Sequence, residues 1–132
     1  MEGKGTGFFK NYLIENEEIL IILNCIKETD PIISLPKSLP KSLQGILSPR
    51  YCVAFTNKGF HIASKTFETL NYEGTLYYKE INFFRSSIED KSFTIIHSNY
   101  SSSKFINAEI RTPLKLTTLK DAFEYVEKKQ EA

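Results

Sequence analysis

The sequence predicts a mainly β (α+β) protein: a curled antiparallel sheet, or partly open barrel, of about six to seven strands with a C-terminal capping helix. Three observations predict this fold class. Alternating or continuous β-branched and aromatic runs, broken by turn residues, recur over residues 19–112. Ten Phe and seven Tyr with no Trp form a composition that favours strands. A sustained apolar stripe with helical spacing follows at the C-terminal end.

The chain of 132 residues is long enough for one domain with a hydrophobic core. We expect this domain to span residues 16–130, after an N-terminal extension over residues 1–15 whose Gly-rich start frays. The sequence shows no secretory signal and no apolar run long enough to cross a bilayer, so a cytoplasmic protein is expected.

Aromatic residues of the extension recur at a nearly helical spacing and predict a short helix over residues 8–16. Phe8, Phe9 and Tyr12 have two interpretations. They form a surface for a protein partner, or they cap the open end of the sheet. We favour the second.

The strands are predicted from local patterns. A β-branched run within residues 17–29 gives the first strand, and "YCVAFTNKGFHIAS" (51–64) gives a hairpin around the turn "TNKG". A further strand or strand pair is predicted over residues 75–87, and later strands over 92–98 and 104–112. Residues 30–49 hold four of the five prolines, and we expect this connection to pack on the domain.

Two elements near the C-terminus carry clear patterns. In residues 104–112, Ile106, Ala108 and Ile110 alternate with polar residues, which predicts that these three side chains face the core. The terminal helix has an apolar stripe of Leu119, Ala122, Phe123 and Val126. Thr118 precedes this helix as its expected N-cap.

The order of these segments resembles the pleckstrin-homology-like superfold, in particular the small bacterial pleckstrin-homology-like domains. "NEEILIIL" looks like the opening strand of the family, "YCVAFTNKGFHIAS" is similar to its hairpin, and "LYYKEINFF" looks like a later segment. Two features depart from the family: Phe60 stands where an Arg is usual after the turn, and the Pro-rich connection is long. The resemblance implies a domain that binds peptides, partner domains or lipid head groups.

Composition argues against several functions. Lys and Arg number 17 against 16 Asp and Glu, without the basic excess of a nucleic-acid binder, so no nucleic-acid partner is expected. Cys25 and Cys52 lie in apolar runs and are expected to be buried free thiols. With only His61 and His97 in addition, no metal site and no cofactor are expected.

No catalytic motif is present, and the protein is not expected to be an enzyme. Catalysis by acid or base needs a histidine or carboxylate with an orienting partner. His61 alternates with Phe60 and Ile62 and is expected to face away from them, toward solvent. His97 alternates with Ile96 in the same way, and neither histidine has a partner near it in the sequence.

The function predicted is a non-catalytic binding module for a protein partner of unknown identity. The alternatives are a domain with weak affinity for anionic lipid surfaces, or a small regulatory or immunity-type assembly protein. The residues that would contact lipid are Lys37, Lys41 and Arg50, where lipid-binding members of the family place basic residues. This sparse set predicts weak membrane binding or none. The sequence leaves the oligomeric state open.

Overall fold

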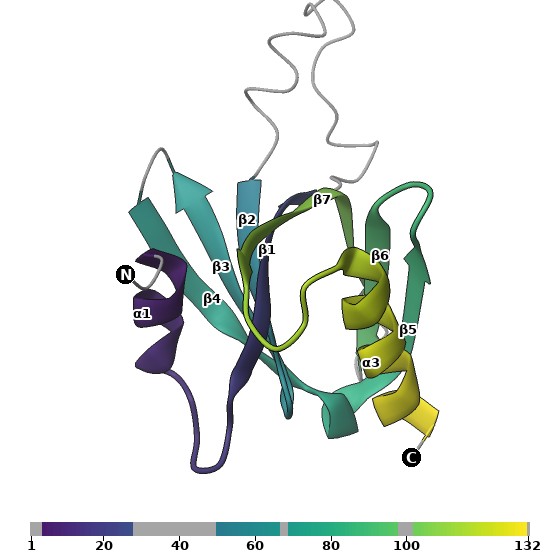
Figure 1. The fold of residues 1–132 in the computed structure, drawn as a ribbon, viewed down its shortest axis with the longest axis horizontal. Helices are drawn as coiled ribbons and strands as arrows, with labels where there is room; N and C mark the ends of the chain where they lie inside the picture. Colours follow the sequence, from purple (N-terminus) through teal and green to yellow (C-terminus); the bar gives the residue numbers. More distant parts are fainter. Residues whose placement is uncertain (1–3, 28–49, 67–68, 98–101, 132) are drawn as a thin grey trace, which may run out of the picture.

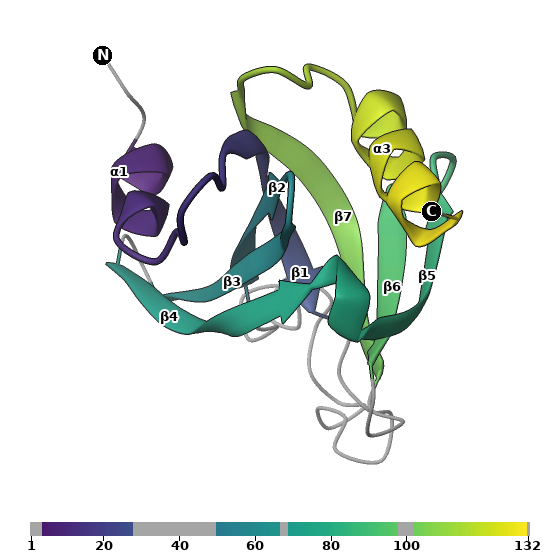
Figure 2. The same ribbon diagram turned by 90° about the horizontal axis from the view of Figure 1, so that it is seen from below.

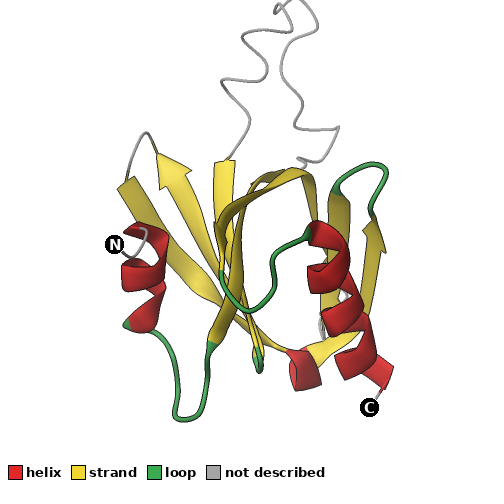
Figure 3. Ribbon diagram, viewed as in Figure 1, coloured by secondary structure: helices red, strands yellow, loops and turns green. Residues whose placement is uncertain are grey.

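The computed structural model describes residues 4–27, 50–66, 69–97 and 102–131. Seven strands form one antiparallel sheet, and helices flank it (Figures 1 and 3). The strands are β1 (Ile19–Lys27), β2 (Arg50–Thr56), β3 (Gly59–Thr66), β4 (Thr69–Tyr77), β5 (Ile81–Ser87), β6 (Ser92–His97) and β7 (Ser102–Pro113). The helices are α1 (Lys4–Lys10), the 3-10 turn η2 (Tyr78–Glu80) and α3 (Leu119–Glu131). The predicted fold class is confirmed. The Pro-rich connection lies outside the described residues.

The sheet curls but does not close. Its strand order is β4-β3-β2-β1-β7-β6-β5, so β4 and β5 are the two edges. These strands are consecutive in the chain and are joined by η2, yet the described residues show no ladder between them. Figure 2 shows the resulting curvature, with α3 lying over β5 and β6. The sheet therefore keeps a free edge on β5.

The main core lies between the concave face of the sheet and α3. Phe55, Phe60, Phe93 and Phe123 meet there in edge-on, stacked and tilted ring contacts. Ala122 and Val126 join Phe123 in this core, as the apolar stripe of the helix predicts. The expected N-cap is also confirmed: the Asp121 amide donates to Thr118 Oγ1 at 3.1 Å.

The simple alternation expected in β7 is wrong. Asn107 has a left-handed φ of 53°, and the pairing with β1 slips by one residue between Asn24 and Ile26. This bulge puts an extra residue into β7 and reverses the side-chain faces beyond it. Phe105 and Ala108 consequently face the core, while Ile110 is 39% exposed.

The hairpin is confirmed, and its turn sequence has specific causes. Thr56 Oγ1 accepts the amides of Lys58 and Gly59, both at 3.0 Å, which closes the turn. Asn57 ties the turn to the chain before β1, because its Oδ1 accepts the Glu18 amide at 2.7 Å. A Cβ at Gly59 would collide with the Leu76 carbonyl oxygen and lie 2.6 Å from Tyr77 Cα. Only glycine fits there.

The N-terminal helix starts earlier than predicted. It covers Lys4–Lys10 instead of residues 8–16, and it includes part of the Gly-rich start that was expected to fray. The chain then leaves the helix in a turn in which the Tyr12 amide donates to the Phe9 carbonyl at 3.0 Å. Tertiary packing overrides the low helix propensity of glycine here, since Phe9 is fully buried against the sheet.

Candidate functional site

A groove lies between the free edge strand β5 and helix α3. Its volume is about 450 Å³. We call it the β5–α3 groove, and its lining residues are Asn82, Phe83, Phe84, Arg85, Ser86, Glu127 and Gln130. All of them belong to two elements that are fixed to the core. The groove is therefore a property of the scaffold.

The core holds β5 in place through Phe84. This side chain is buried and its ring lies 5.9 Å from Phe60 and 6.2 Å from Phe123. At the start of the strand, η2 is anchored by Tyr78, whose hydroxyl donates to the Thr56 carbonyl at 2.6 Å. Burial strongly raises the pKa of that hydroxyl. Gln130 of α3 donates to the Tyr78 carbonyl at 3.2 Å and closes this end of the groove.

The outward face of β5 carries an apolar and a cationic group together. A register slip between Ile81 and Phe83 marks an irregularity in the pairing with β6. Phe83 points away from the core and is 45% exposed. The Arg85 guanidinium lies 5.3 Å from the centre of the Phe83 ring, within the range of a cation–π contact.

The helical wall of the groove contributes a carboxylate. Glu127 Oε1 accepts a hydrogen bond from Ser86 Oγ at 3.1 Å, which links α3 to β5. A free strand edge beside a hollow of this kind can accept an extended peptide as an additional strand. Main-chain hydrogen bonds to β5 would supply affinity. Contacts of Phe83, Arg85 and Glu127 with the side chains of the peptide would supply selectivity.

Sequence reasoning missed this groove. It predicted a strand or strand pair over residues 75–87 but assigned no site to it. The edge position of β5 depends on the order of all seven strands, which no local pattern gives. The pair Phe83 and Phe84 also looks equally apolar in the sequence, although the structure exposes one and buries the other.

Of the three predicted lipid contacts, only Arg50 lies in the described residues; Lys37 and Lys41 lie outside them. Arg50 borders a hollow of about 390 Å³ on the convex face of the sheet. Lys65, paired with Arg50 across the β2–β3 ladder, and Lys91 line the same hollow, and so does the carboxylate of Glu109. Arg50 thus gains two cationic neighbours that the sequence analysis did not place with it.

The predicted aromatic surface lies over the convex face of β1–β4, opposite the main core. Phe9 is completely buried there against Ile22, Cys52 and Ala54. Phe8 is partly buried, and Tyr12, which is 38% exposed, stacks on Tyr72 at 3.6 Å. Phe9 therefore has no surface to offer a partner in this conformation. The helix covers a face of the sheet, and not an open end.

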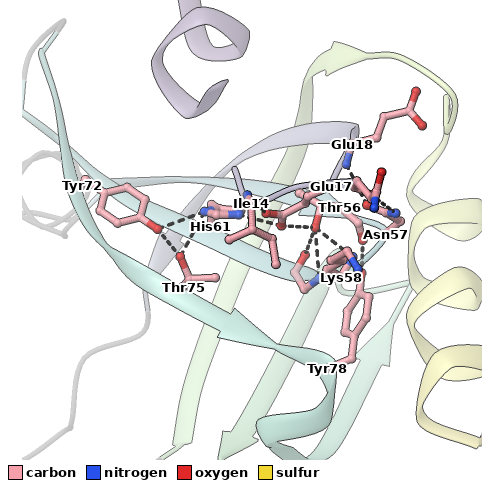
Figure 4. Close-up of polar contacts among 12 residues, drawn as sticks. Ile14, Glu17, Glu18, Thr56, Asn57, Lys58, His61, Tyr72, Thr75 and Tyr78 are labelled. Atoms are coloured by element: carbon pink, nitrogen blue, oxygen red, sulfur yellow. Dashed lines mark hydrogen bonds and ion pairs between the residues drawn. The ribbon is translucent and has the colours of Figure 1, made fainter. Parts of the chain in front are cut away.

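A buried polar network lies beneath this N-terminal segment (Figure 4). Glu17 Oε2 accepts from Thr56 Oγ1 at 2.7 Å and from His61 Nε2 at 2.8 Å, and its Oε1 accepts from the Ile14 amide at 3.0 Å. His61 Nδ1 lies 2.9 Å from the Tyr72 hydroxyl and 3.1 Å from Thr75 Oγ1. The two hydroxyls also hydrogen bond to each other.

The expectation that His61 faces solvent is wrong. His61 does point away from Phe60, as the alternation predicts, but the residues before β1 cover that face, and both its side chain and that of Glu17 have no exposed area. A slip in the β3–β4 register puts Tyr72 and Thr75 on the same side, where both reach His61. Its carboxylate partner comes from 44 residues earlier in the chain.

The electrostatics of the network favour a charged Glu17. Burial raises the pKa of this carboxyl, but hydrogen bonds from Thr56, the Ile14 amide and His61 lower it more, so its pKa lies below the ordinary value. Because the carboxylate only accepts, His61 Nε2 carries a proton and Nδ1 faces the two hydroxyls. Carboxylate, imidazole and hydroxyl can relay protons, yet the first two are closed to any substrate.

Both cysteines are buried free thiols, as predicted. Cys25 faces the main core and Cys52 faces the cluster under α1. Burial raises the pKa of Cys52 to about 11, against opposing effects of Arg111 and Lys65. His97 is half-buried at the end of β6.

Two further findings concern metals and membranes. Within the described ranges, no three His, Cys, Asp or Glu side chains gather as metal ligands do. The same part of the chain contains no helix that is long and apolar enough to span a membrane.

Comparison with known proteins gives matches at the level of structure. No protein-family model and no curated protein sequence matches the chain. The C-terminal domain of an unknown protein from Leishmania infantum superposes with a TM-score of 0.58 and 11% identity, over 98% of this chain and 100% of that chain. At this identity the likeness shows a shared fold alone.

Two matches contain pleckstrin-homology domains. A DUF1696 family protein with a pleckstrin-homology domain from Shewanella loihica has a TM-score of 0.48 and 12% identity, over 96% of this chain and 94% of that chain. The linker-DH/PH domains of p115-RhoGEF have a TM-score of 0.48 and 11% identity, over 99% of this chain and 34% of that chain. The curled, unclosed seven-stranded sheet with its C-terminal helix is the architecture that the resemblance read from the sequence implied.

Proposed function

We propose that this chain is a non-catalytic binding module that holds an extended peptide of a protein partner in the β5–α3 groove. The observation that carries the proposal is the free edge of β5 beside a hollow of about 450 Å³. The peptide would lie along β5 as an eighth strand.

The exposed chemistry of β5 supports this use of the edge. Proteins usually protect an edge strand with charged residues, proline or a covering segment, because an open edge recruits other chains. In Figures 1 and 2, β5 lies at the outer side of the sheet with α3 next to it. The side chain of Phe83 on this strand is 45% exposed. The opposite edge, β4, lies beside α1 and carries Tyr72 under Tyr12.

The non-catalytic part of the proposal has its own support. The carboxylate–imidazole–hydroxyl array of Glu17, His61 and Thr75 is the strongest catalytic candidate in the described residues, and its first two members are inaccessible. We assign it a structural role. The proposal includes no cofactor, and the free buried thiols fit a reducing compartment such as the cytoplasm.

Selection from a random-peptide phage library, followed by NMR titration of an enriched peptide, tests the proposal. We expect chemical-shift changes along β5 and at Ser86 and Glu127, and new protection of β5 amides from exchange. Phe83→Ala should weaken binding at least about fivefold, since exposed aromatic anchors carry much of an interface energy.

The matched control is Ile88→Ala. Ile88 is 46% exposed, close to the 45% of Phe83, but it lies in the β5–β6 turn outside the groove. Equal losses from the two variants, or shifts confined to another face, would refute the groove as the binding site.

A further inference from the structure

We infer that the β5–α3 groove selects peptides with the order basic–acidic–apolar–apolar, read from N- to C-terminus and bound antiparallel to β5. The inference rests on the proposed function and names the class of peptide. It follows from four side chains, those of Phe83, Phe84, Arg85 and Glu127, and from the register of one strand.

Arg85 is the acid-binding element. Among the described residues its guanidinium has no ion-pair partner, while its place 5.3 Å from the Phe83 ring keeps it extended along the strand. A guanidinium offers a fork of donors that suits a carboxylate, and stacking on an aromatic ring leaves that fork free. An Asp or Glu of the peptide is its natural complement.

Glu127 is the base-binding element. One of its oxygens accepts from Ser86 Oγ at 3.1 Å, and an ionised carboxylate has capacity for further donors. Glu127 lies on α3 next to Ser86. In β5, Ser86 is two residues after Phe84. A Lys or Arg of the peptide placed opposite Ser86 would reach it.

The register converts these positions into an order. Phe83 and Arg85 share the outward face of β5, whereas Phe84 and Ser86 face α3. A peptide strand opposite β5 places its residues within about 4.5–5.5 Å of their cross-strand neighbours. Each peptide residue therefore meets one β5 residue.

The direction follows from the sheet. Every ladder in the described residues is antiparallel, and antiparallel pairing is slightly more stable per residue. An antiparallel peptide meets Ser86 first, then Arg85, Phe84 and Phe83. Its residues are thus basic beside Glu127, acidic beside Arg85, apolar beside the buried Phe84, and apolar against Phe83.

Fluorescence anisotropy with labelled synthetic peptides tests the inference. The probe carries Lys-Glu-Val-Leu between Ser and Thr flanks, and the comparison peptide carries the same residues in reverse order. We expect the forward peptide to bind at least about fivefold more tightly. Replacing its Glu by Lys should cost about fivefold, the upper value for an exposed ion pair.

A charge-reversal variant of Arg85 gives the decisive experiment. Arg85→Glu should weaken the forward peptide and restore binding of the Glu-to-Lys peptide. Arg85 is exposed, so the variant should fold, and circular dichroism checks this. The matched control is Lys120→Glu, an exposed charge reversal at the opposite end of α3 that should change neither affinity.

The outcomes separate the two proposals. Equal binding of forward and reverse peptides along β5 would overturn the inferred order and leave the proposed function in place. Tighter binding of the reverse peptide would show parallel docking and also overturn it. If no library or synthetic peptide perturbs β5, the proposed function itself is wrong.

Discussion

At the scale of single residues, the carboxylate of Glu17 joins parts of the chain that are distant in sequence. It accepts from the Ile14 amide before β1, from Thr56 at the end of β2 and from His61 in β3. Through His61 the network reaches Tyr72 in β4. A buried carboxylate with several donors stabilises a fold only while all of them are present. Glu17 therefore fixes the N-terminal segment to the sheet.

Glu17→Gln should destabilise the protein at pH 7 by about 1–3 kcal/mol, because an amide cannot satisfy the same donors. The folded-state pKa of Glu17 lies below the ordinary value of an unfolded glutamate, so its stabilising effect is full above that ordinary pKa and is lost as the pH falls through the folded pKa. The difference in unfolding free energy between wild type and variant should thus shrink below about pH 4. Urea unfolding at several pH values measures it.

The neighbouring acid provides the control. Glu18 is exposed and pairs with Lys115 at 2.8 Å on the surface. Exposed pairs contribute little, so Glu18→Gln should change stability by less than about 1 kcal/mol at any pH. A pH-independent penalty for Glu17→Gln would show that the carboxylate charge is not what the network stabilises.

At the scale of elements, α3 is held by its apolar stripe. Phe123 is almost fully buried and contacts the rings of Phe55, Phe84 and Phe93. Phe123→Ala should cost about 3–5 kcal/mol, the usual loss for a buried phenylalanine. The exposed neighbour Glu124→Ala should have almost no effect. Denaturant midpoints measure both, and similar losses would mean that the helix is not docked on this core.

The elements also show how far the sequence predicts the fold. The hairpin, the terminal helix and the strand segments follow local patterns: period-2 runs, turn residues and a capping threonine. The burial of His61 on the convex face of the sheet could not be predicted from a local pattern, because the residues that cover this side chain lie before β1. The bulge at Asn107 was not predictable either, since one left-handed residue reverses a face that perfect alternation suggests.

The same limits applied to the candidate site. Arg50 could be identified as a surface cation, but its proximity to Lys91 depends on pairing between strands far apart in sequence. The β5–α3 groove depends on which strand ends the sheet. Edge positions result from the whole topology, while each strand pattern reports only its own burial.

At the scale of the whole molecule, the number and distribution of charges determine how strongly the domain binds an anionic membrane. The chain carries a formal net charge of +1. Its notable basic hollow contains Arg50, Lys65 and Lys91 together with the carboxylate of Glu109. The acidic group among these three cations reduces the electrostatic attraction between the hollow and an anionic membrane surface.

We therefore predict no firm binding to vesicles with a physiological fraction of anionic lipid at about 0.15 M salt. Each cation near such a surface contributes about 1 kcal/mol, so the three contribute about 3 kcal/mol. Even millimolar affinity needs about 4 kcal/mol. Vesicle co-sedimentation should leave the protein in the supernatant, and the Arg50→Ala/Lys65→Ala/Lys91→Ala variant should behave alike. Pelleting of the wild type that the triple variant abolishes would instead make the convex hollow a lipid site and displace the peptide groove as the principal binding surface.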